Sequence, residues 1–213
     1  MLTLNWNSPI LPGFIVFEGL DGAGTTTQAR ELVHYLEHVG TRAEFTCEPT
    51  DYLTGSTIRR LLVGPEFARP WTLALLFAAD RYEHVERPET GIRARCREGI
   101  TVVSDRYLFS SIAYQGAFVD SAAVERLNHD FPLPEHLIFV DTPQDEASRR
   151  MAGRGPRDTL EQDDVQLRVA ARYRAVVDAF AQRSAMLVHT IDGTQSRRRV
   201  FQDILRALQL ESG

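Results

Sequence analysis

The sequence predicts an α/β protein with a mostly parallel sheet of about five strands, covered by helices on both faces. Short apolar runs of strand length alternate along the chain with stretches whose apolar residues recur at helical spacing. Glycine and proline turns separate them. Such alternation implies right-handed crossovers and ligand binding at the carboxyl ends of the strands. The 213 residues, 43% of them hydrophobic, suit one domain spanning residues 1–213.

The predicted elements follow one another in regular order. Residues 14–18 form a short apolar run before a glycine-rich turn, and Leu32, Val33 and Leu36 then give helical spacing up to Gly40. The predicted strands are 14–18, 43–46, 101–104, 137–141 and 186–191. The predicted helices are 26–39, 56–63, 70–85, 144–151 and 196–210.

Composition excludes several classes of protein. The net charge is −5 and the charged residues of both signs are interleaved, so we expect no nucleic-acid partner. Cys47 and Cys96 are too few for a disulfide framework, and no apolar run is long enough to span a membrane. Residues 1–12 have no signal-peptide pattern, and we expect a cytoplasmic protein. All 24 basic residues are arginine.

A glycine-rich segment between a predicted strand and a predicted helix has the context of a phosphate-binding loop (P-loop). It reads Gly19-Leu20-Asp21-Gly22-Ala23-Gly24-Thr25-Thr26. The general pattern has lysine where Thr25 stands, so this motif alone leaves open a structural turn that caps a helix. If the loop binds nucleotide, its ATP and phosphate contacts are Gly19, Asp21, Gly22, Ala23, Gly24, Thr25, Thr26 and Thr27.

A second segment is more specific. Residues 105–107 read Asp-Arg-Tyr, and Ser110, Ala113, Tyr114 and Gln115 follow. This resembles the pattern Asp-Arg-Tyr/Phe-x-x-Ser-x-x-Ala-Tyr-Gln of thymidylate kinases at every fixed position. Residues 77–81 (Phe-Ala-Ala-Asp-Arg) and 48–50 (Glu-Pro-Thr) resemble two further blocks of that family. The resemblance covers most of residues 13–192 and implies a P-loop NTPase-type fold with a small arginine-containing lid at about residues 149–161.

The resemblance implies the reaction ATP + dTMP → ADP + dTDP with Mg²⁺, and a homodimer. Phe77 would stack on thymine, while Arg81 and Gln115 would hydrogen-bond its polar edge. Tyr114 would lie against the sugar and exclude a 2′-hydroxyl, and Asp21 would accept from the 3′-hydroxyl. The dTMP-binding residues implied are Asp21, Glu48, Pro49, Phe77, Arg81, Arg106, Ser111, Tyr114 and Gln115.

The catalytic groups implied are mainly arginines. Arg106 would clamp the acceptor phosphate, and Thr26 and Asp105 would hold the metal. In the family subgroup that has glycine after the loop aspartate, as Gly22 is here, catalytic arginines come from the lid. The candidates are Arg149, Arg154 and Arg157. Singly, each of these residues has a structural alternative: Phe77 could belong to the core, and the lid arginines could form a solvated face.

Three positions that are usually cationic in the family carry no charge here: Thr25, Cys47 and Thr159. Phosphoryl transfer depends on positioning and electrostatics, so these losses favour reduced activity or a noncatalytic nucleotide-binding homologue. Neighbouring arginines such as Arg157 could instead compensate, and we prefer this interpretation because the base-recognition residues are all present. A kinase for another nucleoside monophosphate is the remaining alternative.

Overall fold

The computed structural model describes residues 6, 8–64, 68–152, 159–183 and 185–210. Its centre is a five-stranded sheet of β1 (Ile10–Gly19), β2 (Ala43–Cys47), β3 (Thr101–Asp105), β4 (Leu133–Asp141) and β5 (Leu187–Asp192). The strand order is β2-β3-β1-β4-β5 and each neighbouring pair is parallel. The predicted parallel sheet is therefore confirmed.

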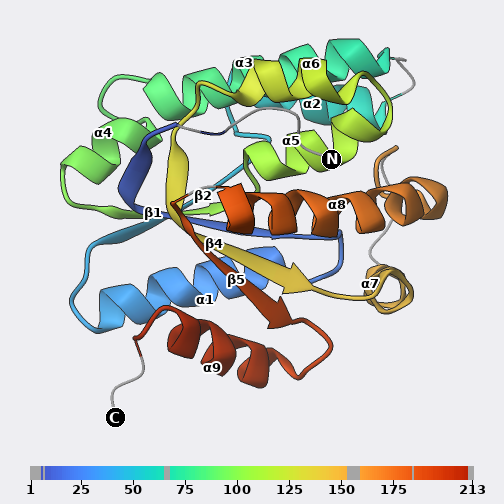
Figure 1. Cartoon of the computed structure of the whole chain (residues 1–213). Coiled ribbons are helices and arrows are strands. Elements are labelled where there is room, and N and C mark those ends of the chain that lie inside the picture. Colours follow the sequence, from blue (N-terminus) through green and yellow to red (C-terminus); the bar gives the residue numbers. More distant parts are fainter. Residues whose placement is uncertain (1–5, 7, 65–67, 153–158, 184, 211–213) are drawn as a thin grey trace.

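Helices cover both faces of this sheet (Figure 1). The described helices are α1 (Thr25–His38), α2 (Leu53–Val63), α3 (Pro70–Glu86), α4 (Ile92–Arg97), α5 (Leu108–Tyr114), α6 (Ser121–Asn128), α7 (Gln144–Met151), α8 (Asp163–Arg183) and α9 (Arg197–Ala207), with the 3₁₀ turn η1 (Gln115–Ala117). Helices α1 and α9 lie together under one face, and α5 and α8 lie against the other (Figure 1).

Alternation along β1 divides the core into two apolar layers. Phe14 and Val16 point to the side of α5 and α8, whereas Ile15 and Phe17 point to the side of α1 and α9. All four side chains are buried, because a parallel sheet covered on both faces has no solvated side. The continuous apolar run in the sequence therefore reflects burial on both faces.

The elements differ from the predicted bounds in two ways. Strand β1 begins at Ile10 rather than at residue 14, because Ile10 and Leu11 pair with β4 on the far side of an irregularity at Pro12–Gly13. Four helices, α4, α5, α6 and α8, have no counterpart among the predicted helix ranges. Six of the seven residues of α5 are buried, so its sequence has no one-sided apolar stripe to indicate a helix.

The topology brings the functional segments to one edge. The chain leaves β1 to build β2 and β3 on one side and later builds β4 and β5 on the other. The loop after β1 and the Asp105–Arg106 pair at the end of β3 therefore meet at the carboxyl ends of neighbouring strands, where ligands bind in open α/β sheets. Among the described helices, none is long and apolar enough to cross a membrane.

Candidate active site

The loop from Leu20 to Gly24 connects β1 to the amino end of α1. Gly22 and Gly24 have positive φ angles of 89° and 93°, conformations that glycine adopts without steric cost. No side chain caps α1, so backbone N–H groups at its first turn are available to an anion. They open onto a cavity of about 500 Å³, here called the phosphate cavity. It is lined by Asp21, Gly22, Gly24, Thr25, Thr26, Thr27, Arg30, Phe45, Cys47, Glu48, Arg59, Asp105, Arg106, Met151 and Glu161.

Two threonines at the start of α1 behave differently. Thr25 is buried, and its methyl carbon Cγ2 packs so close to Gly19 that a Cβ atom there would lie 3.1 Å away. Thr26 instead donates its hydroxyl to the Asp105 carboxylate across the cavity floor. The other Asp105 oxygen, Oδ1, is buried without a hydrogen-bond partner among the described residues. This leaves a hydroxyl and a carboxylate side by side at the phosphate cavity.

Arg106, directly after β3, links this strand to the glycine-rich loop through hydrogen bonds of its side chain. Its φ is 76°, and its guanidinium donates to the Gly19 carbonyl oxygen, to Asp21 Oδ1 at 2.7 Å and to the Tyr173 hydroxyl at 3.1 Å. Asp21 also accepts from the Tyr114 hydroxyl at 2.9 Å and from Gln166 Nε2 at 2.7 Å. Loop, β3, α5 and α8 are therefore tied together around one carboxylate, which lies at the boundary between two cavities.

The second cavity, here called the base cavity, has a volume of about 130 Å³. It is lined by Asp21, Glu48, Pro49, Leu62, Phe77, Arg81, Arg106, Tyr107, Ser110, Ser111, Tyr114, Gln115 and Leu160. Asp21, Glu48 and Arg106 line both cavities. A ligand with an apolar ring at one end and a phosphate at the other would therefore place its phosphate beside the loop.

The family is shown by comparison with known proteins. The model of the family described as thymidylate kinase matches residues 17–204. The chain belongs to the thymidylate kinase family. It is 36% identical over 201 residues to a probable thymidylate kinase of Methanococcus maripaludis, covering 92% of this chain and 94% of the relative.

Two further proteins are similar along most of their length. A thymidylate kinase of Pelotomaculum thermopropionicum is 34% identical over 204 residues, with 92% of each chain covered. The crystal structure of thymidylate kinase from Ehrlichia chaffeensis superposes with a TM-score of 0.69 over 95% of this chain and 99% of that chain, at 24% identity. The structural match shows the thymidylate kinase fold.

All the predicted dTMP-binding residues of this thymidylate kinase homologue line the base cavity. Phe77 is half-buried and belongs to neither apolar core layer, so the alternative that it only fills the core is not supported.

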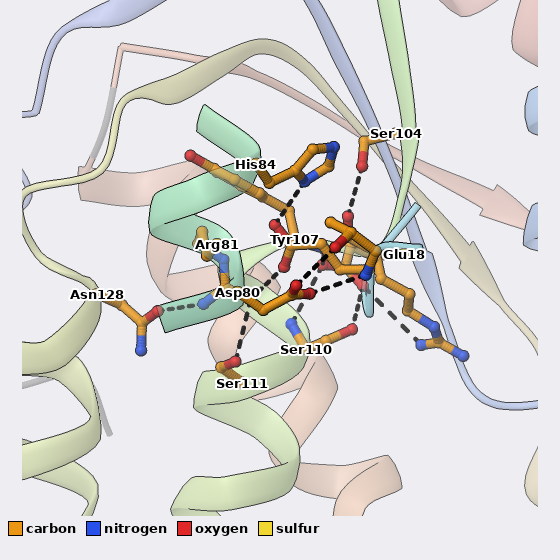
Figure 2. A network of polar contacts seen from close by, with 12 residues as sticks. Glu18, Asp80, Arg81, His84, Ser104, Tyr107, Ser110, Ser111 and Asn128 are labelled. Carbon is orange, nitrogen blue, oxygen red and sulfur yellow. Dashed lines mark hydrogen bonds and ion pairs between the residues drawn. The ribbon is translucent and has the colours of Figure 1, made fainter. Parts of the chain in front are cut away.

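The terminal nitrogens of Arg81 are hydrogen-bonded to protein groups and are not free for a ligand. Its side chain is 1% exposed, and its terminal nitrogens donate to Glu48, to Asn128 and to Ser111 Oγ at 3.1 Å (Figure 2).

Glu48 neutralises this buried arginine and receives a second contact from His84 Nδ1 at 3.0 Å. The network leaves two polar atoms of the base cavity without partners in the described part of the chain, namely Arg81 Nε and Gln115 Oε1. One is a donor and the other an acceptor. Buried polar atoms are usually paired, so these two are candidates for hydrogen bonds with a ligand that carries the complementary groups.

A carboxyl group underlies this site. Glu18 accepts from the Tyr107 and Ser110 backbone N–H groups at 2.9 and 3.1 Å, and from the Ser110 and Tyr173 hydroxyls (Figure 2). Burial raises its pKa from 4.5 to about 7, because the charged form loses solvation; Arg106, 3.9 Å away, and these donors lower the pKa only in part. Glu18 thereby holds the start of α5 against β1.

The predicted lid arginines are not brought to either cavity in the described part of the chain. Arg149 is 75% exposed and pairs with Glu146 of its own helix at 2.5 Å, and it lines neither cavity. Arg154 and Arg157 lie outside the described residues. Thr159 is described and donates its backbone N–H to the Leu62 carbonyl oxygen at 3.2 Å. The catalytic role of the three arginines stays a prediction.

Sequence reasoning missed three residues that the fold adds to the site: Arg30, Arg59 and Gln166. Arg59, on α2, donates to the carbonyl oxygens of Pro49 and Thr50 and lies 4.0 Å from the Cys47 sulfur. Burial raises the pKa of that thiol. No local pattern marks Arg59 or Gln166, because each reaches the site from a helix far along the chain from the motifs. Arg30 lies one helical turn after Thr26, and this spacing of a cation could have indicated it.

Proposed function

We propose that this chain transfers the terminal phosphoryl group of ATP to dTMP and forms ADP and dTDP. The observation that carries this proposal is the pairing of the base cavity with the phosphate cavity, which share Asp21, Glu48 and Arg106. A nucleoside monophosphate in the first cavity would present its phosphate to a nucleotide held by the loop. Membership of the thymidylate kinase family supports the same reaction.

The unpaired atoms of the base cavity support thymine over cytosine, although uracil has the same hydrogen-bonding edge. Thymine presents an N3–H donor flanked by two carbonyl oxygens. Gln115 Oε1 would accept from N3–H, and Arg81 would donate to a carbonyl oxygen. Cytosine would present an acceptor to Gln115 Oε1 and an amino donor to Arg81, and both contacts would be lost. Phe77, on the wall of this cavity, would stack on the ring.

The sugar would lie near the Tyr114–Asp21 hydrogen bond. Tyr114 is almost completely buried and is fixed by Asp21 at 2.9 Å, so it cannot turn aside for an additional hydroxyl group. This supports rejection of ribonucleotides by steric conflict at the 2′ position. Asp21 would accept from the 3′-hydroxyl with the lone pairs that Arg106, Tyr114 and Gln166 leave open.

The phosphate groups would lie between the loop and Arg106. Backbone N–H groups of the loop would hold the ATP phosphates, and the Arg106 fork would orient the dTMP phosphate for in-line attack. Thr26 and Asp105 supply the hydroxyl and carboxylate oxygens that Mg²⁺ prefers. The unpaired Asp105 Oδ1 would be free to contact the cation or a water molecule bound to it. Bound Mg²⁺ neutralises charge on the phosphate oxygens.

Three further assignments belong to this proposal. Arg149, Arg154 and Arg157 would act from a lid at about residues 149–161, which for Arg149 requires release from Glu146. The chain would act as one catalytic domain within a homodimer. It would work in the cytoplasm, which the two free thiols Cys47 and Cys96 support.

A coupled assay of ADP release with dTMP, ATP and Mg²⁺ tests the proposal. We expect turnover with dTMP, and far less with dCMP and UMP. Gln115→Leu should lower kcat/KM for dTMP by roughly ten- to a hundredfold, the effect of leaving one buried hydrogen bond unmade. Gln182→Leu, which removes an exposed amide on α8 away from both cavities, is the matched control.

The rival functions predict different results. A noncatalytic homologue would gain thermal stability from dTMP without releasing ADP. A kinase for another nucleoside monophosphate would show higher kcat/KM for dCMP, UMP or dUMP than for dTMP. Either outcome would overturn the proposal, and the second would direct attention to Phe77, Arg81 and Gln115.

A further inference from the structure

The phosphate cavity lacks the lysine that normally contacts nucleotide phosphates in such loops, since Thr25 stands in its place. A buried threonine hydroxyl supplies no positive charge. Among the described residues, the cations that line this cavity are Arg30, Arg59 and Arg106. Whichever of them has uncommitted N–H groups is best placed to supply the missing charge.

Two of the three arginines are occupied by the protein itself. Arg106 is bound by the Gly19 carbonyl oxygen and by Asp21. Arg59 donates to two backbone carbonyl oxygens of the 49–50 turn and lies 3.5 Å from the Asp51 carboxylate. Part of the charge of both is thus neutralised, and part of their hydrogen-bonding capacity is used.

Arg30 is in a different state. It forms no hydrogen bond or ion pair with any residue of the described chain, and its guanidinium carbon lies 3.9 Å above the centre of the Phe45 ring. Stacking on an aromatic face holds a guanidinium by its flat side and leaves its N–H edges free. Arg30 is thus an exposed residue whose guanidinium rests on the Phe45 ring and keeps uncommitted donors.

Arg30 lies close to two positions that are usually cationic in the family, Thr25 and Cys47. It lies one helical turn after Thr26, on the same face of α1, and Thr26 is bonded to Asp105. Phe45, on which it stacks, precedes Cys47 by two residues on the same face of β2, and Cys47 is paired in register with Asp105. Arg30 and Arg59 both act on the Cys47 thiol through their charge.

We propose that Arg30 is a phosphate-binding residue of this enzyme and supplies, from the second turn of α1, the positive charge that Thr25 lacks. The inference rests on the proposed function and names a further residue of its site. The group recognised is a phosphate oxygen of either nucleotide: the ATP phosphates at the loop or the acceptor phosphate beside Cys47. A lysine at position 25 would duplicate this charge.

Steady-state kinetics test the first part of the inference. Arg30→Gln should lower kcat by about 10²–10³-fold, the range found when one preorganised donor is removed from a transition state. Arg30→Lys should keep part of the activity. The matched control is Arg126→Gln, which removes an equally charged, exposed side chain of α6 whose carboxylate partner Asp120 is 3.8 Å away. Equal rates for Arg30→Gln and Arg126→Gln would overturn the inference.

A double-mutant cycle distinguishes charge replacement from a structural effect. If Arg30 supplies the charge missing at position 25, Thr25→Lys should raise the rate of Arg30→Gln by at least tenfold more than it raises the rate of the native chain. A purely structural loss at position 30 would not be restored by a lysine in the loop. The same gain in both backgrounds would contradict charge replacement.

Binding measurements separate this inference from the proposed function. Inorganic tripolyphosphate should raise the unfolding temperature of the native chain and of Arg126→Gln, and raise that of Arg30→Gln much less. This readout needs neither dTMP nor turnover. Titration with ATP and with dTMP separately identifies the source, because weaker binding of only one locates the contact. Unchanged affinity of Arg30→Gln for all three ligands would overturn the inference.

Discussion

Glu18 is a carboxyl group at the end of β1 that folding removes completely from water. Its pKa of about 7 lies above the ordinary value of 4.5, so the folded state binds this proton more tightly than the unfolded state does. Protonated Glu18 therefore contributes most to the free energy of unfolding below pH 4.5, and this contribution is lost as the pH rises towards and through 7.

Comparison with Glu18→Gln isolates this contribution. The free energy of unfolding of the native chain, minus that of Glu18→Gln, should fall by about 3 kcal/mol between pH 4.5 and pH 8, at 1.36 kcal/mol per pKa unit. Urea denaturation across this range measures the difference. Glu89→Gln, in an exposed turn, should show no such dependence. A constant difference for Glu18→Gln would contradict a raised pKa.

At the scale of residues, the sequence predicted those side chains that lie within contiguous motifs. Asp105, Arg106 and Tyr114 belong to one segment, and the local backbone fixes their spacing. Gln166 and Arg59 could not be predicted, since each reaches the site from a separate helix. The residues that flank them in the sequence form no recognisable motif. Long-range packing decides such contacts.

At the scale of elements, the loop before α1 depends on two glycines with similar backbone angles and different surroundings. A Cβ atom on Gly22 would lie 2.3 Å from the Ala147 carbonyl oxygen of α7, whereas one on Gly24 would meet nothing within 4 Å. Each alanine variant would pay the cost of a left-handed conformation, roughly 1–2 kcal/mol. Gly22→Ala would in addition push α7 away from the loop.

We therefore expect Gly22→Ala to destabilise the protein more than Gly24→Ala does, and to raise KM for ATP more strongly. Urea denaturation and steady-state kinetics of the two variants measure this, and Gly24→Ala serves as the control for backbone strain. Equal losses of stability would show that contact between the loop and α7 contributes nothing beyond the conformation of the loop.

The predictability of elements followed their burial. Strands β1, β3 and β4 were predicted because burial on both faces gives each of them a run of consecutive buried residues. Helix α1 was predicted because Leu32, Val33 and Leu36 form one buried stripe. Helix α5 has no exposed face with which to contrast its buried one, so its sequence carries no helical periodicity.

At the scale of the molecule, α3 presents large apolar side chains to solvent. Trp71, Leu75 and Tyr82 are spaced along one face of the helix and are 41%, 45% and 60% exposed. Exposed apolar clusters are typical of interfaces between proteins. This supports the homodimer proposed above, with α3 on its interface.

Trp71→Glu tests this assembly. A charge in an apolar interface should shift the protein towards a monomer at micromolar concentration, because it would be buried without a partner. Sedimentation equilibrium measures the mass. Val39→Glu, which places the same charge on an exposed apolar residue at the end of α1, is the control and should leave the mass unchanged. A monomeric native chain would contradict the proposal.

Periodicity and local motifs, which are properties of contiguous residues, were enough to predict the parallel α/β sheet, the glycine-rich loop after β1 and the segment from Asp105 to Gln115. The pairing of Glu48 with Arg81 and the presence of Arg30 beside Thr25 in the phosphate cavity emerge only from the three-dimensional structure. Both depend on the packing of distant elements. A buried charge destabilises the fold unless an opposite charge or hydrogen-bonding groups lie beside it. The order of residues does not specify which group that is.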